Sequence, residues 1–142
     1  MPSPIELDML LKVVIAAVVG YAVGFQREMT GHFAGDRTFS LICMASALFT
    51  SLGLDVFGQQ SVEAASRIAQ NVLTGVGFIG GGMILKEGAT IRGLTTAAGI
   101  WAMAAVGVAI GTGQYFVAIL TAAMVFVVFA LGRFRSHAEG PD

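Results

Sequence analysis

The stretch GVGFIGGGMIL, Gly75 to Leu85, decides the fold of this chain together with its continuation KEGATIRGLTTAAGIW, Lys86 to Trp101. Five glycines fall between positions 75 and 82, inside a segment that is otherwise apolar enough to lie in a membrane. Glycine costs a soluble helix about 1 kcal/mol relative to alanine, but between membrane helices the missing side chain lets two backbones approach closely. The stretch is therefore either a tight seam between helices or a deliberately broken helix around a site.

The composition of the whole chain indicates a membrane protein. Of its 142 residues, 56% are hydrophobic and 12% are charged, and the mean hydropathy is +0.80, whereas soluble domains carry about 25% charged residues. A chain of this size cannot bury so much apolar surface, so we expect the lipid bilayer to cover it. The net charge of −1 argues against a nucleic-acid partner. The single cysteine, Cys43, excludes an intrachain disulfide and a multi-cysteine metal site.

Continuously apolar runs predict an all-α, polytopic membrane protein with five transmembrane helices. A hydrocarbon core of about 30 Å needs about 20 apolar residues per helix, and the runs lack the period-2 alternation of a barrel strand. Because the connections are short, we expect one domain over residues 1–142. The expected helices cover residues 7–25, 38–57, 68–85, 93–110 and 114–131.

The basic residues predict how these helices are oriented, because lysine and arginine gather in cytoplasmic loops. Six lie on one side of the expected membrane, against two, Lys12 and Arg67, on the other. We therefore expect the N-terminus outside the cell and the first loop, the third loop and the C-terminus in the cytoplasm. The six are Arg27, Arg37, Lys86, Arg92, Arg133 and Arg135.

Small residues predict where the helices touch. We expect the tightest contact between the glycines of 68–85 and a ridge on the fourth helix, since a connection of about seven residues makes the two helices antiparallel neighbours. The fifth helix, rich in Phe and Val, is expected to face lipid. A second seam is expected on the helix 38–57, with Asp36 capping its start. The ridge consists of Thr95, Ala98, Ala102, Ala105 and Ala109. The second seam consists of Ser40, Cys43, Ala47 and Thr50. The chain also contains three GxxxG pairs, Gly20/Gly24, Gly77/Gly81 and Gly107/Gly111.

Charged and polar residues inside the expected helices each admit two interpretations. Asp8 and Lys12 stand four apart, in the order that favours a helical ion pair, so Lys12 either reaches the outer interface beside Asp8 or takes part in a proton or ion relay. Glu63 and Arg67 form a similar pair, expected on a short interfacial helix. Polar side chains in a membrane helix need partners, so a trio in the third helix is either structural or functional. That trio is Gln70, Asn71 and Thr74.

One motif match is rejected. GVGFIG, Gly75 to Gly80, fits the GxGxxG dinucleotide fingerprint, which also needs a preceding strand and an acidic residue about 20 positions later. No Asp or Glu occurs between Glu87 and Glu139. We therefore expect no nucleotide cofactor here, and the chain shows no nucleophile–base pair that would indicate an enzyme.

Several motifs follow one another along the chain: GxxxGFQRE (Gly20 to Glu28), GDRT (Gly35 to Thr38), SRIAQNVLTGVGFIGGGMIL (Ser66 to Leu85), KEG (Lys86 to Gly88) and IRGLTTAAGIWAMAAVGVAIG (Ile91 to Gly111). Taken together, these motifs resemble the N-terminal membrane domain of the MgtC/SapB family across nearly the whole chain. By motif, the family's characteristic positions fall on Arg27, Glu28, Arg37, Thr38, Arg67, Gln70, Gly77, Gly80, Gly82, Glu87, Arg92, Gly93, Thr95 and Trp101, and the interpretation of the third helix adds Asn71, Thr74 and Gly81.

The resemblance implies a bacterial inner-membrane protein associated with growth at low magnesium and, in pathogens, with survival in macrophages. It further implies a regulator of other membrane machinery, the F-type ATP synthase above all. The chain departs from the family at Asp36, where members commonly read GLRT, at Ala64 and Ala65, and at Thr95 and Ala102, where many have Asn and Cys. Longer members continue into a soluble domain, whereas this sequence stops at Asp142.

Two functions follow as hypotheses. The first is a non-enzymatic regulator, expected as a homodimer, whose helices bind other helices and whose cytoplasmic loops present Arg27, Glu28, Lys86, Glu87 and Arg92. The second is a small transporter or ion-binding protein in which the glycine segment is unwound around a midplane site. A Mg²⁺ site usually needs one or two carboxylates, and the third, fourth and fifth helices contain none, which favours the regulator.

Overall fold

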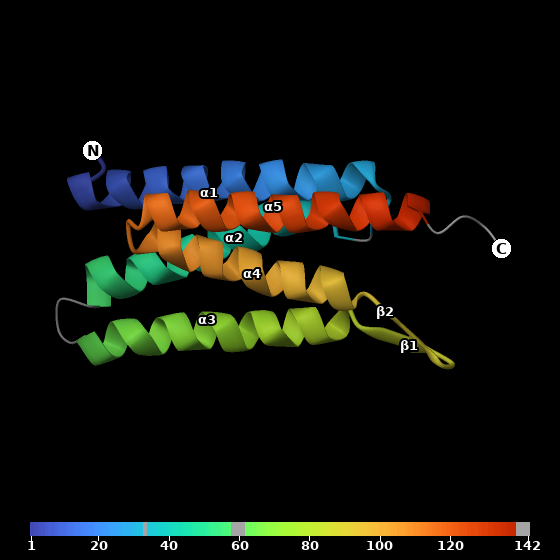
Figure 1. Ribbon diagram of the computed structural model, residues 1–142. Helices are drawn as coiled ribbons and strands as arrows, with labels where there is room; N and C mark the ends of the chain where they lie inside the picture. Colours follow the sequence, from blue (N-terminus) through green and yellow to red (C-terminus); the bar gives the residue numbers. More distant parts are fainter. Residues whose placement is uncertain (33, 58–61, 139–142) are drawn as a thin grey trace.

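The computed structural model describes residues 1–32, 34–57 and 62–138. They form a bundle of five long α-helices, and successive helices run in opposite directions along one axis (Figure 1). The helix α1 begins at one end of the bundle and α5 finishes at the other (Figure 1). A π-helix, η1, extends α2, and an antiparallel hairpin joins α3 to α4. The elements are α1 (Pro4–Met29), α2 (Asp36–Leu52), η1 (Gly53–Phe57), α3 (Val62–Gly82), β1 (Leu85–Glu87), β2 (Thr90–Arg92), α4 (Leu94–Gly111) and α5 (Tyr115–Ala138).

Among the described residues, four helices are long and apolar enough to cross a membrane. The fifth, α3, is long enough but carries Arg67, Gln70 and Asn71 in its first half, which lower its apolar character. It nevertheless runs beside α4 along the bundle, between the same two ends (Figure 1). The four apolar segments are Pro4–Met29, Asp36–Asp55, Leu94–Gly111 and Tyr115–Gly132.

The third helix and the connection after it differ from the prediction. The helix begins at Val62 and takes in Glu63 and Arg67, which were expected on a separate short helix. It ends at Gly82 rather than at residue 85, because β1 and β2 form a hairpin closed by a two-residue turn. Gly88 has φ +63° at that turn, a conformation that suits glycine in tight hairpins.

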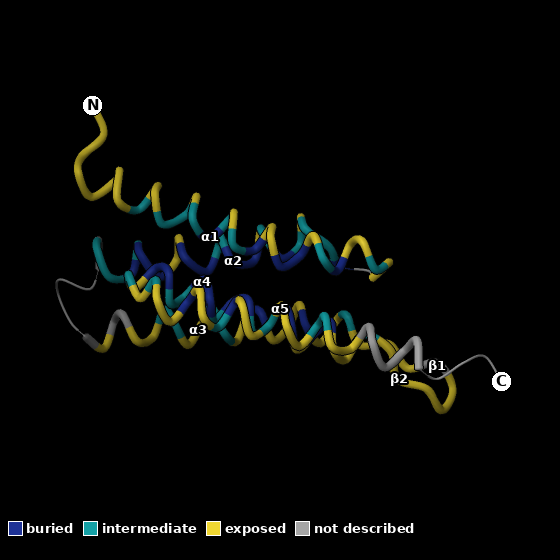
Figure 2. The backbone as a smooth tube through the Cα atoms, turned by 45° about the horizontal axis from the view of Figure 1, so that its top comes forward, coloured by how far each residue is buried: buried dark blue, intermediate teal, exposed yellow. Residues whose placement is uncertain are grey.

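The core lies between α2 and α4, whose buried positions fill the middle of the bundle (Figure 2). The predicted seam on α2 is confirmed, since Cys43 and Ala47 are fully buried and Thr50 is 4% exposed. Ser40 Oγ donates a hydrogen bond of 2.9 Å to the carbonyl of Ala17 on α1. Phe39, which is not part of the predicted seam, is fully buried as well. The seam is therefore wider than the small residues alone indicated.

Glycines of α1 and α4 make close contacts with the α2 backbone. A Cβ atom added at Gly20 would lie 2.6 Å from the carbonyl oxygen of Phe39, and one at Gly24 would lie 2.6 Å from Cα of Asp36. On α4, a Cβ at Gly107 would overlap the Cys43 carbonyl oxygen, and one at Gly111 would lie 2.7 Å from that of Ala47. The first and last of the three GxxxG pairs are thus confirmed as packing contacts. Side chains larger than hydrogen cannot fit at these positions.

The glycines of α3 behave in the opposite way, so the predicted seam there was wrong. A Cβ at Gly75, Gly77, Gly81 or Gly82 would meet nothing within 4 Å. Gly80 alone faces α4, at an ordinary distance of 3.5 Å from the carbonyl oxygen of Ala97. The expected ridge is not the contact either, because Thr95 and Ala98 are exposed. The cause is that α3 lies at the edge of the bundle with these four glycines turned away from α4.

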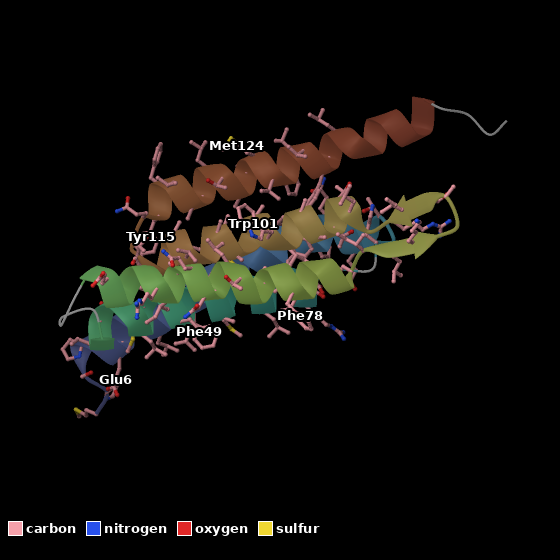
Figure 3. All side chains as sticks on the ribbon, turned by 90° about the horizontal axis from the view of Figure 1, so that it is seen from below. Glu6, Phe49, Phe78, Trp101, Tyr115 and Met124 are labelled. Carbon is pink, nitrogen blue, oxygen red and sulfur yellow. The ribbon has the colours of Figure 1, made fainter. Side chains whose placement is uncertain are left out.

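The alternative of a helix broken at these glycines is also wrong, since α3 is one continuous helix from Val62 to Gly82. The outer position expected for α5 is confirmed. Most of its side chains are exposed, Phe116 by 80%, while Ala118 and Ala122 pack inward. Figure 3 shows Met124 pointing away from the bundle and Phe78 projecting from α3 on the opposite side.

Candidate functional site

Arg27, near the end of α1, is buried inside the bundle. It follows Gly20 and Gly24 on the same helix face, at spacings of four and three residues, and that face lies against α2. The side chain is only 4% exposed. The sequence led us to expect Arg27 in a cytoplasmic loop. The expectation was wrong because α1 extends to Met29 and turns this residue inward.

The guanidinium of Arg27 connects three helices. Its Nη2 donates a hydrogen bond of 2.6 Å to Oγ1 of Thr96 on α4. Its central carbon lies 4.4 Å from the centroid of the Phe129 ring on α5, within the range of a cation–π interaction. Its Nε is buried and has no hydrogen-bond partner among the described residues. One cation therefore organises this end of the bundle while part of its donor capacity is unused.

A pocket of about 690 Å³ opens beside this guanidinium. It lies where α1 and α5 end and where β2 leads into α4 (Figure 1). Its lining mixes basic, hydroxyl and apolar side chains. The described residues around it are Arg27, Met29, Thr30, His32, Ile91, Arg92, Gly93, Leu94, Thr95, Thr96, Val128, Phe129 and Gly132.

His32 follows α1 and is fixed at the edge of this pocket. Its backbone N–H donates to the carbonyl of Arg27 at 3.2 Å, and its Nδ1 lies 2.8 Å from Oγ1 of Thr30. Partial burial, followed by the positive charge of Arg27, lowers the pKa of His32 below its usual value of 6.5. The imidazole is therefore mostly neutral at pH 7.

Glu28 has a structural role that the sequence did not reveal. Its Oε2 accepts a hydrogen bond of 3.2 Å from the backbone N–H of Asp36, which satisfies one donor at the start of α2. Asp36 was expected to cap α2, but it is the first helical residue, and the cap position is Gly35, which offers no side chain. At the start of α2, the N–H of Asp36 is therefore satisfied by a carboxylate from α1, while the N–H of Arg37 donates to Oδ1 of Asp36 itself.

The other residues singled out from the sequence do not form one site. The pocket gathers Arg27, Arg92, Gly93 and Thr95, together with Thr96 and His32, which the sequence did not single out. The rest lie elsewhere or are exposed, and the side chain of Glu87 is outside the described part. Arg37 is exposed and Thr38 half-buried at the start of α2; Arg67, Gln70, Asn71, Thr74, Gly77, Gly81 and Gly82 are exposed along α3, where Gly80 is buried; and Trp101 is 52% exposed on α4.

A second polar cluster lies toward the opposite end of the bundle. Lys12 Nζ is 2.7 Å from Oδ2 of Asp8, as the sequence predicted, and 3.6 Å from Oδ2 of Asp55 on η1. The Lys12 side chain is 11% exposed. The sequence missed Asp55 as a partner because its position depends on the π-helical turn after α2. This cluster ties α1 to η1.

An apolar groove of about 650 Å³ separates α2 from α3. Both walls are mainly aliphatic, with one amide, that of Asn71, on the α3 side. Figure 3 shows Phe49 and Phe78 projecting outward on this side of the molecule. The described lining residues are Leu41, Ile42, Ala45, Ser46, Phe49, Ile68, Asn71, Val72, Gly75, Val76 and Ile79.

Comparison with known proteins identifies the family. Residues 13–137 match the model of the MgtC family. The chain belongs to the MgtC family. As an MgtC-family protein with four helices apolar enough to span a bilayer, it is a membrane protein. No solved structure matches it significantly.

Curated MgtC-family relatives cover most of the chain. It is 44% identical over 126 residues to YhiD of Escherichia coli K12, provisionally named a magnesium transporter, with 85% of this chain and 59% of YhiD aligned. It is 38% identical over 118 residues to the protein MgtC of Brucella abortus, with 83% and 48% aligned. It is 38% identical over 126 residues to SrpB of Synechococcus elongatus, with 81% and 69% aligned. The chain thus spans about half the length of YhiD and of the Brucella protein.

Proposed function

We propose that this MgtC-family protein is a non-enzymatic regulator in the bacterial inner membrane that supports adaptation to low magnesium by binding other membrane proteins. The F-type ATP synthase and membrane transporters are the partners that the family resemblance suggests. One observation carries the proposal: α3 presents a glycine face that its own bundle leaves uncovered.

The α3 face has the character of a surface for another helix. Gly77 and Gly81 are four residues apart, and a Cβ at either would meet nothing within 4 Å. Such pairs let a second membrane helix approach closely. On the same helix the Gln70 and Asn71 side chains are exposed and make no hydrogen bond to the described part of the chain. An amide in hydrocarbon is costly without a partner, so we propose that a transmembrane helix of another protein, with small residues and a hydrogen-bonding group, packs here.

Transport of an ion is the second candidate function, favoured by the name of YhiD. The midplane site first considered for it needs an interrupted helix, and α3 is continuous. No group of three potential metal-binding side chains exists among the described residues. These observations rank the regulator first.

The test combines association with stability. In cells that depend on this protein for growth at low magnesium, Gly77→Leu and Gly81→Leu should abolish function, and a photocrosslinker at position 78 should lose its heterologous product. Each variant should still be extracted as a folded, monodisperse protein. Phe116→Leu, on the exposed outer face of α5, is the matched control and should crosslink and complement normally.

Three results would overturn this proposal. A leucine at 77 or 81 that leaves growth and crosslinking intact would show that the face binds no partner, and a crosslinked product of twice the monomer mass alone would show a homodimer. Magnesium or proton flux in proteoliposomes of the purified protein would establish the transporter instead.

We also propose five membrane crossings, with the N-terminus outside and the C-terminus in the cytoplasm. This agrees with α3 running between the same bundle ends as α2 and α4 (Figure 1). A cysteine introduced at position 60 should react with an impermeant maleimide only from outside, and one at position 90 only from inside. Labelling of both from one side would refute this topology.

A further inference from the structure

We propose that the pocket beside Arg27 is a binding site for a phosphate group carried by an organic molecule. The proposal is independent of the regulatory role suggested above. It rests on a buried cation with unused donors, on the charge of the surrounding groups and on the size of the pocket.

The guanidinium of Arg27 has hydrogen-bond donors to spare. A guanidinium carries five N–H groups, and among the described residues Arg27 uses one of them, for Thr96. Its Nε is completely buried without a partner, and the residue as a whole is only 4% exposed. Leaving buried donors unpaired is costly, and the planar fork of arginine fits a phosphate in a bidentate manner. The pocket thus contains a buried group suited to an anion.

The groups around the guanidinium also favour an anion, through the positive charge of Arg92 and the neutral polar groups beside it. Arg92 and His32 also line the pocket, and so does the first turn of α4, Leu94 to Thr96. No side chain caps the amino end of α4, where backbone N–H groups and the helix dipole favour an anion. None of the described lining residues is acidic, and the nearby carboxylate of Glu28 accepts from Asp36 instead. Among the described lining residues, an anion would therefore meet the charges of Arg27 and Arg92 and several hydrogen-bonding groups, and no carboxylate.

Size and apolar lining define the class of ligand. About 690 Å³ is within the usual range for a small-molecule site, about 300–1,000 Å³, and exceeds what inorganic phosphate alone would fill. Met29, Val128 and Phe129 add an apolar wall, which suits an attached organic group. The phosphate could come from two sources: the headgroup of an anionic phospholipid at the membrane surface, or a soluble phosphate ester.

The alternative is that Arg27 is only a structural clamp between Thr96 and Phe129. A clamp predicts that loss of Arg27 changes stability and nothing else. A phosphate site predicts that Arg92, which is exposed and outside that clamp, also affects binding. Arg92→Gln therefore separates the two, even where Arg27→Gln fails to fold.

The experiment uses the full chain purified in a neutral detergent. Inorganic phosphate is titrated calorimetrically, and in parallel the protein is reconstituted in nanodiscs of phosphatidylcholine with or without phosphatidylglycerol and examined for retained lipid by native mass spectrometry. Arg27→Gln and Arg92→Gln should each weaken binding by at least about tenfold, the loss expected for one charge-assisted contact. Arg37→Gln, which removes an exposed arginine outside the pocket at the same end, should change binding less than about twofold.

The phosphate titration and the nanodisc measurement distinguish the two sources of the phosphate group. Saturable binding of phosphate that both pocket variants weaken supports a soluble ligand, whereas selective retention of phosphatidylglycerol that both weaken supports a lipid headgroup. Failure of the native chain to bind either probe would overturn the proposal. So would a loss in Arg37→Gln as large as the loss in Arg92→Gln.

Discussion

The pair Gly107/Gly111 on α4 and the pair Gly77/Gly81 on α3 have the same spacing but lie on opposite kinds of surface. A Cβ at Gly111 would lie 2.7 Å from the Ala47 carbonyl oxygen, whereas one at Gly77 or Gly81 would meet nothing within 4 Å. The α4 pair holds the bundle together from within. The α3 pair contributes nothing to that bundle, so its small size is available for contact with another molecule.

This comparison shows that a GxxxG pair indicates only that another helix can pack closely against the backbone at that position. Whether the approaching helix belongs to the same chain depends on the position of the helix in the bundle. The helix α4 lies in the middle, in contact with α1, α2, α3 and α5, while α3 lies at the edge (Figure 1). Substitutions should therefore separate folding at one pair from association at the other.

The largest effect is expected for Gly107→Leu. The new side chain would meet the Cys43 carbonyl oxygen and Cβ of Ser46, the latter 2.7 Å from the first added carbon. Overpacking in a core typically costs about 1–3 kcal/mol, and the cost should exceed about 3 kcal/mol here because backbone is one of the neighbours. Loss of the monodisperse peak in size-exclusion chromatography would report it, and normal thermal unfolding would break the comparison.

Gly81→Ala should change the stability of the protein in the opposite direction to Gly107→Leu. Alanine has the higher helix propensity by about 1 kcal/mol, and the space around Gly81 is open. We expect an unchanged or higher unfolding temperature in detergent. If activity falls while stability does not, the face is used for binding. A destabilised protein would mean that α3 packs more tightly than described.

Acidification should destabilise the C-terminal end of α1 and the turn with His32 that follows it, but it should leave α3 unchanged. Because the pKa of His32 is lowered in the folded protein, the neutral form is favoured by folding. That contribution is present above about pH 6.5, the ordinary histidine value, and is lost as pH falls through the lowered pKa. Hydrogen exchange at residues 30–32 should quicken between pH 7 and pH 5, after correction for the intrinsic rate. His32→Gln should remove the pH dependence, and persistence of the effect in that variant would assign it to another group.

The smallest effect is expected for Phe126→Leu. Phe126 is 43% exposed on α5, and substitutions on such surfaces usually change stability by less than about 0.5 kcal/mol. Thermal unfolding in detergent should match that of the natural chain. A shift as large as that of Gly107→Leu would mean that α5 is covered by another part of an assembly.

Much of the fold could be predicted from the sequence, because helix length and apolar runs are local properties. Five helices, the small-residue seam of α2 and the Asp8–Lys12 pair were all predicted. The environment of the α3 glycines could not be, since nothing local to positions 75–82 tells whether the neighbouring helix is α4 or an outside partner. The hairpin was missed because its strands are only three residues each.

The candidate site was predicted only in part. Arg27 was chosen, but as a loop residue, although its spacing from Gly20 and Gly24 could have indicated that it shares their buried face. Thr96 was missed because its role depends on Arg27, 69 residues away. Contacts of that separation arise from how α1, α4 and α5 meet, which no local pattern records.

The complete burial of Cys43 has a practical consequence for reagent chemistry. It is the one cysteine of the chain, and its side chain has no exposed surface, since the α2–α4 seam covers it. Water-soluble maleimides need an accessible thiolate, so the natural protein should remain unlabelled while folded. Each cysteine introduced at the surface would then be the sole reactive thiol, and the appearance of a second labelled site would itself signal that α4 had separated from α2.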